Sequence, residues 1–112
     1  MMTDYPSQSY LLGRLEVMNR VVARAKLDKV QSVWEKAKII SGYDPRIWRQ
    51  DKCGAWINRY EYGNRESLYG WEKDHIIPAS KGGTDNLSNL RPLQWQNNAK
   101  RQAGRLACQF TS

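Results

Sequence analysis

Two neighbouring residues of this chain combine a base with a hard oxygen ligand. His75 is the only histidine among the 112 residues, and its imidazole titrates closest to neutral pH, so it is the side chain best suited to take a proton from water. Asp74 precedes it directly and offers the carboxylate oxygens that Mg²⁺ or Mn²⁺ prefers. Hydrolysis of a phosphodiester requires such a base and a positive centre for the developing charge. A lone histidine is also often structural, and an aspartate often pairs with a Lys or Arg, so the context of the pair matters.

The residues around this pair supply that context. In chain order they read Trp71-Glu72-Lys73-Asp74-His75-Ile76-Ile77-Pro78, Ser80-Lys81-Gly82-Gly83, Asp85, Asn89-Leu90 and Asn97-Asn98-Ala99-Lys100. An Asp-His pair alone occurs often by chance, but the ordered set at these spacings resembles the motif of HNH endonucleases. Further matches upstream extend the resemblance from about residue 30 to 101: Trp34-Glu35-Lys36-Ala37, Gly42-Tyr43-Asp44-Pro45, Trp48-Arg49 and Cys53-Gly54-Ala55.

The resemblance implies roles for four residues. Asp74 and Asn98 would hold one divalent cation, Mg²⁺ or Mn²⁺, and leave its other positions to water and phosphate. His75 would activate water, and Asn89 would form hydrogen bonds that hold the loop and orient the histidine. Because adjacent strand residues point to opposite faces, the resemblance also implies that the strand ends or bulges at Asp74 and His75. Asn97 is the rival of Asn98, and we expect it to point elsewhere around the helix.

The sequence departs from the family pattern at one place. Many relatives bind a structural zinc through two Cys-x-x-Cys pairs, where this chain has Cys53 with Trp56, and Gln94 with Asn97. One cysteine cannot complete a tetrahedral four-ligand site, so we expect no structural zinc. We expect tryptophans to provide apolar contacts in its place: Trp56, Trp71 and Trp95.

The two cysteines, Cys53 and Cys108, have no short-range partner. A cytosolic setting keeps thiols reduced, so we expect both to be free and partly buried. A disulfide between them stays open as the alternative, because residues far apart in the chain can meet in space.

The charge of the chain favours a polyanionic partner. It has 18 Lys and Arg against 11 Asp and Glu, a formal net charge of +7, which suits double-stranded DNA. Residues 86–112 contain four Lys or Arg and no acidic residue. We expect phosphate contacts from basic residues near the motif: Lys81, Lys100, Arg101 and Arg105. The alternative for any one of them is an ordinary solvated face.

Hydrophobic periodicity predicts the elements that position these residues. Apolar residues recur at helical spacing over about residues 11–40: Leu11, Leu15, Met18, Val22, Leu27, Val30, Trp34 and Ala37. One bent helix or two successive helices would fit, after a disordered lead-in over residues 1–10. Turn signals over residues 41–54 predict a connector.

Beyond residue 54 the helical period disappears. We expect strands over residues 55–57, 71–77 and 90–93 and a helix over residues 95–106. The fold class is therefore α+β: a helical segment and connector (11–52) packed against an HNH ββα-metal finger (53–112) in one compact domain.

No early apolar run is long enough for a signal peptide or a membrane span. We expect a chain without a membrane partner in the cytoplasm of a bacterium or a phage-infected host cell. A different class of function is a non-cleaving DNA-binding or assembly module, for example an accessory to a phage DNA-packaging complex or another large DNA-processing machine. The presence of Asp74, His75 and Asn98 together favours the enzyme.

Overall fold

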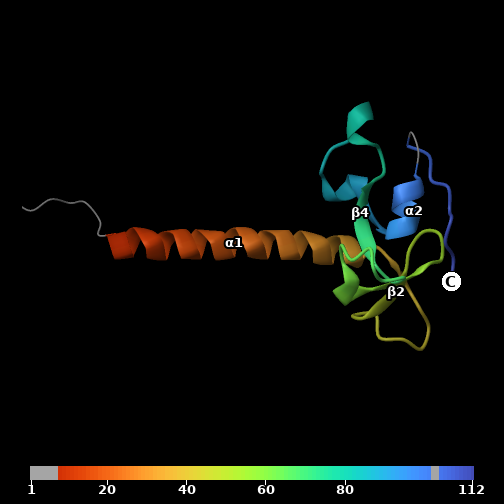
Figure 1. Ribbon diagram of the computed structural model, residues 1–112, viewed down its shortest axis with the longest axis horizontal. Helices are drawn as coiled ribbons and strands as arrows, with labels where there is room; N and C mark the ends of the chain where they lie inside the picture. The colour runs from red at the N-terminus through yellow and green to blue at the C-terminus, as the bar shows by residue number, and fades with distance from the viewer. Residues whose placement is uncertain (1–7, 102–103) are drawn as a thin grey trace, which may run out of the picture.

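The computed structural model describes residues 8–101 and 104–112, with the side chains of residues 9–11 left aside. A long helix is followed by a three-stranded sheet, a strand-loop-strand-helix unit and an irregular tail (Figure 1). The molecule measures 70 × 37 × 25 Å because the helix projects far from the rest of the chain. This arrangement confirms the expected α+β class.

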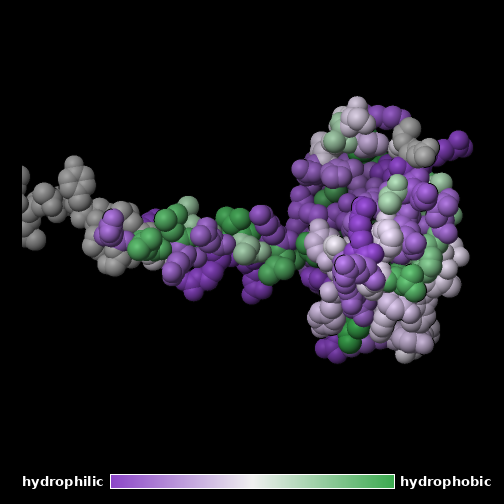
Figure 2. Space-filling model, viewed as in Figure 1, coloured by the Kyte–Doolittle hydropathy of each residue, from purple (hydrophilic) through white to green (hydrophobic). Residues whose placement is uncertain are grey.

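The long helix, α1 (Gln8–Trp34), is mostly exposed. Leu15, Met18 and Val22 are each more than half exposed, and Figure 2 shows apolar residues along the projecting helix. The expected packing of this segment holds only for its last turns, where Val30 and Trp34 are buried. Helical periodicity predicts an apolar stripe but does not say how much of the stripe another element covers.

The boundaries of α1 also differ from the expectation. The helix ends at Trp34 instead of near residue 40, and it already includes residues 8–10 of the expected lead-in. Residues 1–7 lie outside the described residues.

The end of α1 is anchored by one arginine and by the indole of its last residue. The last carbonyls of a helix have no intrahelical donor. The Arg49 guanidinium donates to the carbonyl oxygens of Glu35 at 3.0 Å and Ala37 at 3.2 Å, just beyond the helix end. The indole nitrogen of Trp34 donates to the Pro45 carbonyl at 3.0 Å. These bonds attach the last turn of α1 to the segment that follows it.

Three short antiparallel strands follow: β1 (Lys38–Ile39), β2 (Trp48–Gln50) and β3 (Trp56–Asn58). The expected connector over residues 41–54 therefore contains a strand, and β1 lies where we expected helix. Strands of two or three residues are too short to show an alternating pattern. The turn residues of this segment therefore predicted a connector instead of a strand.

The strand-loop-strand-helix unit consists of β4 (Trp71–His75), β5 (Leu90–Gln94) and α2 (Trp95–Lys100). The strands are antiparallel, with Trp71 opposite Gln94 and His75 opposite Leu90. Two 3-10 turns, Ala79–Lys81 and Leu87–Asn89, lie in the loop between them. This is the expected ββα arrangement. The helix α2 is shorter than predicted, because it ends at Lys100 and the chain from residue 104 onward is irregular.

The hydrophobic core lies between the last turns of α1 and the strands. It consists of Val30, Val33, Trp34, Ala37, Ile57, Trp71 and Leu90. No helix in residues 8–101 and 104–112 is both long and apolar enough to cross a membrane.

Candidate active site

A pocket of about 310 Å³ opens between β4, α2 and the turn that follows β4. Its lining comprises Lys73, Asp74, His75, Pro78, Ala79, Ser80, Asn98, Arg101 and Gly104. The fold thus brings three of the predicted site residues, Asp74, His75 and Asn98, to one pocket, although Asn98 lies 23 positions beyond His75 in the sequence.

The end of β4 gives Asp74 and His75 different environments. Asp74 is buried at 4% exposure, whereas the His75 side chain is 36% exposed. His75 is the last residue of the strand and is still paired with Leu90. Both residues line the same pocket.

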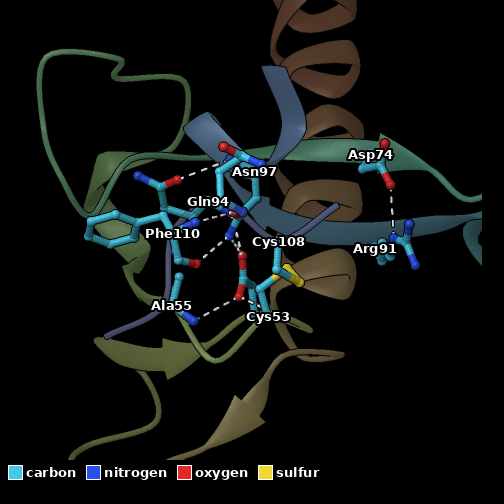
Figure 3. The surroundings of a disulfide bond; sticks show 10 residues. Cys53, Ala55, Asp74, Arg91, Gln94, Asn97, Cys108 and Phe110 are labelled. Carbon is cyan, nitrogen blue, oxygen red and sulfur yellow. Dashed lines mark hydrogen bonds and ion pairs between the residues drawn. A yellow bond between two sulfur atoms is a disulfide. The ribbon is translucent and has the colours of Figure 1, made fainter. Parts of the chain in front are cut away.

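The Asp74 carboxylate is bound by two arginines. Its Oδ2 accepts a hydrogen bond from Arg91 Nε at 2.8 Å (Figure 3), and its Oδ1 accepts one from Arg101 Nη1 at 2.5 Å. The Arg101 guanidinium also donates to the backbone carbonyls of His75 and Ile76. The buried carboxylate is thus paired with two positive charges, which is how a buried charge is normally stabilised.

His75 is held by a carboxylate from the loop. Its Nε2 lies 2.6 Å from Asp85 Oδ1. This hydrogen bond lowers the pKa of the Asp85 carboxyl below its ordinary value. Asp85 is thus a carboxylate that faces the imidazole near neutral pH.

Asn89 holds the loop in place from the start of β5. Its Oδ1 accepts from the backbone N–H of Ile77 at 2.8 Å, and its Nδ2 donates to the carbonyls of Ile77 at 3.0 Å and Thr84 at 2.7 Å. The loop also needs Gly83, because a Cβ there would lie 1.6 Å from the Ile77 carbonyl oxygen. These bonds match the loop-holding part of the role that the resemblance implies for Asn89.

Asn98 is oriented by a carboxylate of β4. Its Nδ2 donates to Glu72 Oε1 at 2.8 Å, and Arg65 binds both oxygens of Glu72 at 2.7 and 2.9 Å. The hydrogen bond from Arg65, together with that from Asn98, lowers the pKa of Glu72 despite its partial burial. Since a carboxylate only accepts hydrogen bonds, the amide NH₂ must face Glu72, and the amide oxygen lies at the other end.

The comparison with known families bears on this geometry directly. Residues 53–102 match the family model described as HNH endonuclease. This segment is therefore similar to an HNH endonuclease domain. The matched segment includes β3, β4, β5 and α2 and contains Asp74, His75, Asn89 and Asn98. Comparisons with curated proteins and with solved structures found no match.

An HNH domain indicates nuclease and DNA-binding activity, and such nucleases typically use a divalent metal. The carboxylate of Asp74 and the amide oxygen of Asn98 are ligands of the kind that a hard cation takes. Both oxygens of Asp74, however, are bound by arginines. Among the described residues, no group of three or more His, Cys, Asp or Glu could hold a metal ion. The donor types thus fit a cation, which would have to compete with Arg101 for Asp74.

The place where many HNH domains carry zinc holds a disulfide and a buried polar network. Cys53 and Cys108 are joined, with their Cα atoms 5.5 Å apart, so the prediction of two free thiols is wrong (Figure 3). The physical reason is that the cysteines are 55 positions apart in the sequence, and only the fold brings the tail back to Cys53. The disulfide attaches the irregular C-terminal tail to the domain.

Asp51 is the centre of the polar network. It is 4% exposed and accepts four hydrogen bonds, from the backbone N–H groups of Cys53, Ala55 and Gln94 and from Asn97 Nδ2, at 2.8 to 3.0 Å. Trp56 and Trp71 do make the expected apolar contacts, with Tyr43 and Trp48 and with Trp34 respectively. The segments around Asp51 are connected in addition by a carboxylate and amides, which the sequence did not predict.

Asn97 links this network to the tail. Its Oδ1 accepts from the backbone N–H groups of Gln109 and Phe110, both at 2.8 Å, and its Nδ2 donates to the Phe110 carbonyl at 2.9 Å (Figure 3). Asn97 is fully buried and points away from the pocket that Asn98 lines, as expected.

The basic residues of the domain divide into two kinds. Lys81, Lys100 and Arg105 have exposed side chains, as a phosphate contact requires. The side chain of Arg101 is only 7% exposed and belongs to the pocket instead. Lys73, from β4, also lines the pocket.

Sequence reasoning assigned no role to three residues that the structure brings to these sites: Asp51, Glu72 and Asp85. Glu72 and Asp85 lie within the same sequence motif as Asp74 and His75. This position could have identified them as candidate site residues. Asp51 had no such signal, because its partners Gln94 and Asn97 lie more than forty residues away.

Proposed function

We propose that this chain is a metal-dependent endonuclease that hydrolyses phosphodiester bonds of double-stranded DNA. The observation that carries the proposal is the meeting of Asp74, His75 and Asn98 in one pocket within the segment that matches the HNH family. His75 would act as the base, and Asp74 and Asn98 would hold one Mg²⁺ or Mn²⁺.

The chemistry follows from the side chains around the pocket. His75 accepts a proton from water as the water oxygen bonds to phosphorus and the bond from phosphorus to the leaving sugar oxygen breaks. Lys73 and Arg101 line the same pocket, and their positive charges favour a phosphate there. A bound divalent cation would supply charge stabilisation for the phosphate and the leaving oxygen.

DNA is the substrate that the charge favours. The exposed side chains of Lys81, Lys100 and Arg105 would contact the phosphate backbone beside the pocket. We therefore expect the observed binding constant to fall with salt, with a log-log slope of about −0.9 for each phosphate neutralised. A DNA substrate also agrees with the proposed place in the cytoplasm of a bacterium or phage-infected cell, within a larger DNA-processing complex.

One observation favours the second candidate, a DNA-binding or assembly module that does not cut. Arg91 and Arg101 both bind the Asp74 carboxylate, so a cation has to displace a guanidinium to reach it. If Arg101 holds Asp74 at all cation concentrations, the domain would bind DNA without cleaving it.

The deciding experiment is incubation of the protein with supercoiled plasmid under Mg²⁺, Mn²⁺ or EDTA. We expect nicked or linear DNA with a cation, none with EDTA, and little with His75→Ala. Cleavage that is equal for wild type and His75→Ala under every cation would overturn the catalytic assignment. Binding by both proteins without cleavage by either would favour the second candidate.

A further inference from the structure

A carboxylate of the loop meets the imidazole of His75 at Nε2. Asp85 Oδ1 lies 2.6 Å from Nε2, which is a short, charge-assisted distance. A carboxylate can only accept a hydrogen bond, so Nε2 carries the proton that the two atoms share. In the neutral ring the other nitrogen, Nδ1, then has the free lone pair.

The position of Asp85 is set by the loop and not by its own burial. The Asp85 side chain is 83% exposed, but the preceding residue, Thr84, is tied to Asn89 through its carbonyl oxygen at 2.7 Å. Asn89 is buried and also binds Ile77 at the other end of the loop. A buried amide therefore brings the two ends of the loop together and places Asp85 over His75.

The charges around Asp85 keep it ionised. The hydrogen bond from His75 lowers the pKa of Asp85 most, and the positive charges of Lys29 from α1 and Lys73 from β4 lower it further. The group that faces Nε2 near neutral pH is thus an anion. A neutral amide or hydroxyl in its place would not carry this negative charge.

We propose that Asp85 is a positioning residue for His75. Its carboxylate holds Nε2–H, which orients the ring and leaves Nδ1 as the nitrogen that takes the proton from water. Asn89 contributes to the same arrangement indirectly, because it holds the loop that carries Asp85. The proposal rests on the proposed function for the proton transfer, whereas the state of the ring can be measured without any DNA.

Because His75 is the only histidine, its ring signals in a ¹⁵N-labelled sample are unambiguous. At about pH 8, where an ordinary imidazole is neutral, we expect the wild-type ring to be protonated at Nε2. The Nε2 proton should be shifted downfield and exchange slowly with water. Asp85→Ala should lose this slowly exchanging proton, and Asn86→Ala, an exposed neighbour, should keep the wild-type spectrum. A wild-type ring protonated at Nδ1, or an Asp85→Ala spectrum equal to that of wild type, would overturn the proposal.

Plasmid cleavage tests the consequence for the reaction. Asp85→Ala should reduce the rate constant of cleavage about tenfold or more, but less than the about 10²- to 10⁴-fold expected for loss of the base. Plasmid binding should stay unchanged. Asp85→Asn should be intermediate, because its amide can offer Nε2 either an oxygen or an NH₂ group and no longer specifies one ring form.

A double variant separates positioning from an independent role. If Asp85 acts through His75, adding Asp85→Ala to His75→Ala should cause no further loss of cleavage. A further loss of tenfold would show that Asp85 acts by another route and would overturn the proposal. If wild type cuts no DNA under any cation, the proposed function fails, and the ring spectra still decide the role of Asp85.

Discussion

Asn97 and Asn98 are neighbours in α2, yet they belong to two regions with different physical character. Asn97 faces the network around Asp51, where its amide oxygen accepts two hydrogen bonds and its nitrogen donates two. Asn98 faces the pocket, where Glu72 takes its NH₂ group. Adjacent helical residues point about 100° apart, so one short helix serves both regions.

The difference lies in how the polar groups are satisfied. The network is buried, and the protein itself supplies the partners of its carboxylate and amides. The pocket is charged, and Arg101 Nε beside it is buried without a hydrogen-bond partner among the described residues. We expect the buried hydrogen bonds around Asp51 to stabilise the fold, and the charged side chains of the pocket to act on a bound phosphate. The two regions should therefore respond differently to substitution.

The largest effect on stability should come from Asp51→Ala. The substitution removes the acceptor of three backbone N–H groups, two of them buried, and of one of the two hydrogen bonds that Asn97 Nδ2 donates; each buried donor left unsatisfied costs about 1–3 kcal/mol. We expect a loss of roughly 4 kcal/mol or more in the free energy of unfolding, a large part of the total for a small domain. Denaturant unfolding followed by circular dichroism measures it. Asp44→Ala, which removes an exposed ion pair with Arg46, is the matched control and should change the free energy of unfolding little. Equal effects for the two variants would contradict the central role of Asp51.

The largest effect on activity should come from His75→Ala. Loss of the base should slow cleavage about 10²- to 10⁴-fold, while the free energy of unfolding and the affinity for DNA change little. Asn97→Ala should show the reverse pattern, with a lower free energy of unfolding and unchanged cleavage by the molecules that stay folded. Single-turnover cleavage and denaturant unfolding of both variants test the comparison, which fails if the two patterns coincide.

An intermediate effect should follow from opening the disulfide. The bond closes a loop with a sequence separation of 55, so its loss in Cys53→Ser/Cys108→Ser should cost about 2–4 kcal/mol. Hydrogen exchange at the backbone amides of Gln109 and Phe110, which bind Asn97, should become faster. Reduction of the wild type should give the same result. A melting temperature that does not change on reduction would show that the network holds the tail without the disulfide.

The smallest effect concerns Glu72 and its dependence on pH. The hydrogen bond from Arg65 lowers the pKa of folded Glu72 below its ordinary value of 4.5. The pair therefore stabilises the fold above that value, and this contribution is lost as the pH falls through the lower folded pKa. Glu72→Gln should cost within about 1 kcal/mol at pH 7, and the difference from wild type should vanish in acid. Unfolding of both proteins at pH 7 and at about pH 3 measures it, and a difference that persists in acid would point to a packing effect instead.

Much of the pocket could be predicted from the sequence, because its residues lie in a continuous stretch with local signals. The strands β4 and β5 and the start of α2 follow from apolar patterning and from the glycine loop between them. The partners of the site residues were less accessible. Arg91 and Arg101 bind Asp74 through strand pairing and helix packing, and Asp85 meets His75 only because Asn89 closes the loop.

The α+β class, the long helical stretch and the residue types around Asp74 and His75 could all be predicted from the sequence, since residue type and periodicity are local properties. The exposure of most of α1, the pairing of Cys53 with Cys108 and the hydrogen bonds of Asp51 with distant segments became known from the folded chain alone. These outcomes depend on which distant segments meet. Contacts between distant segments depend on how the whole chain folds, and a local sequence pattern does not predict them.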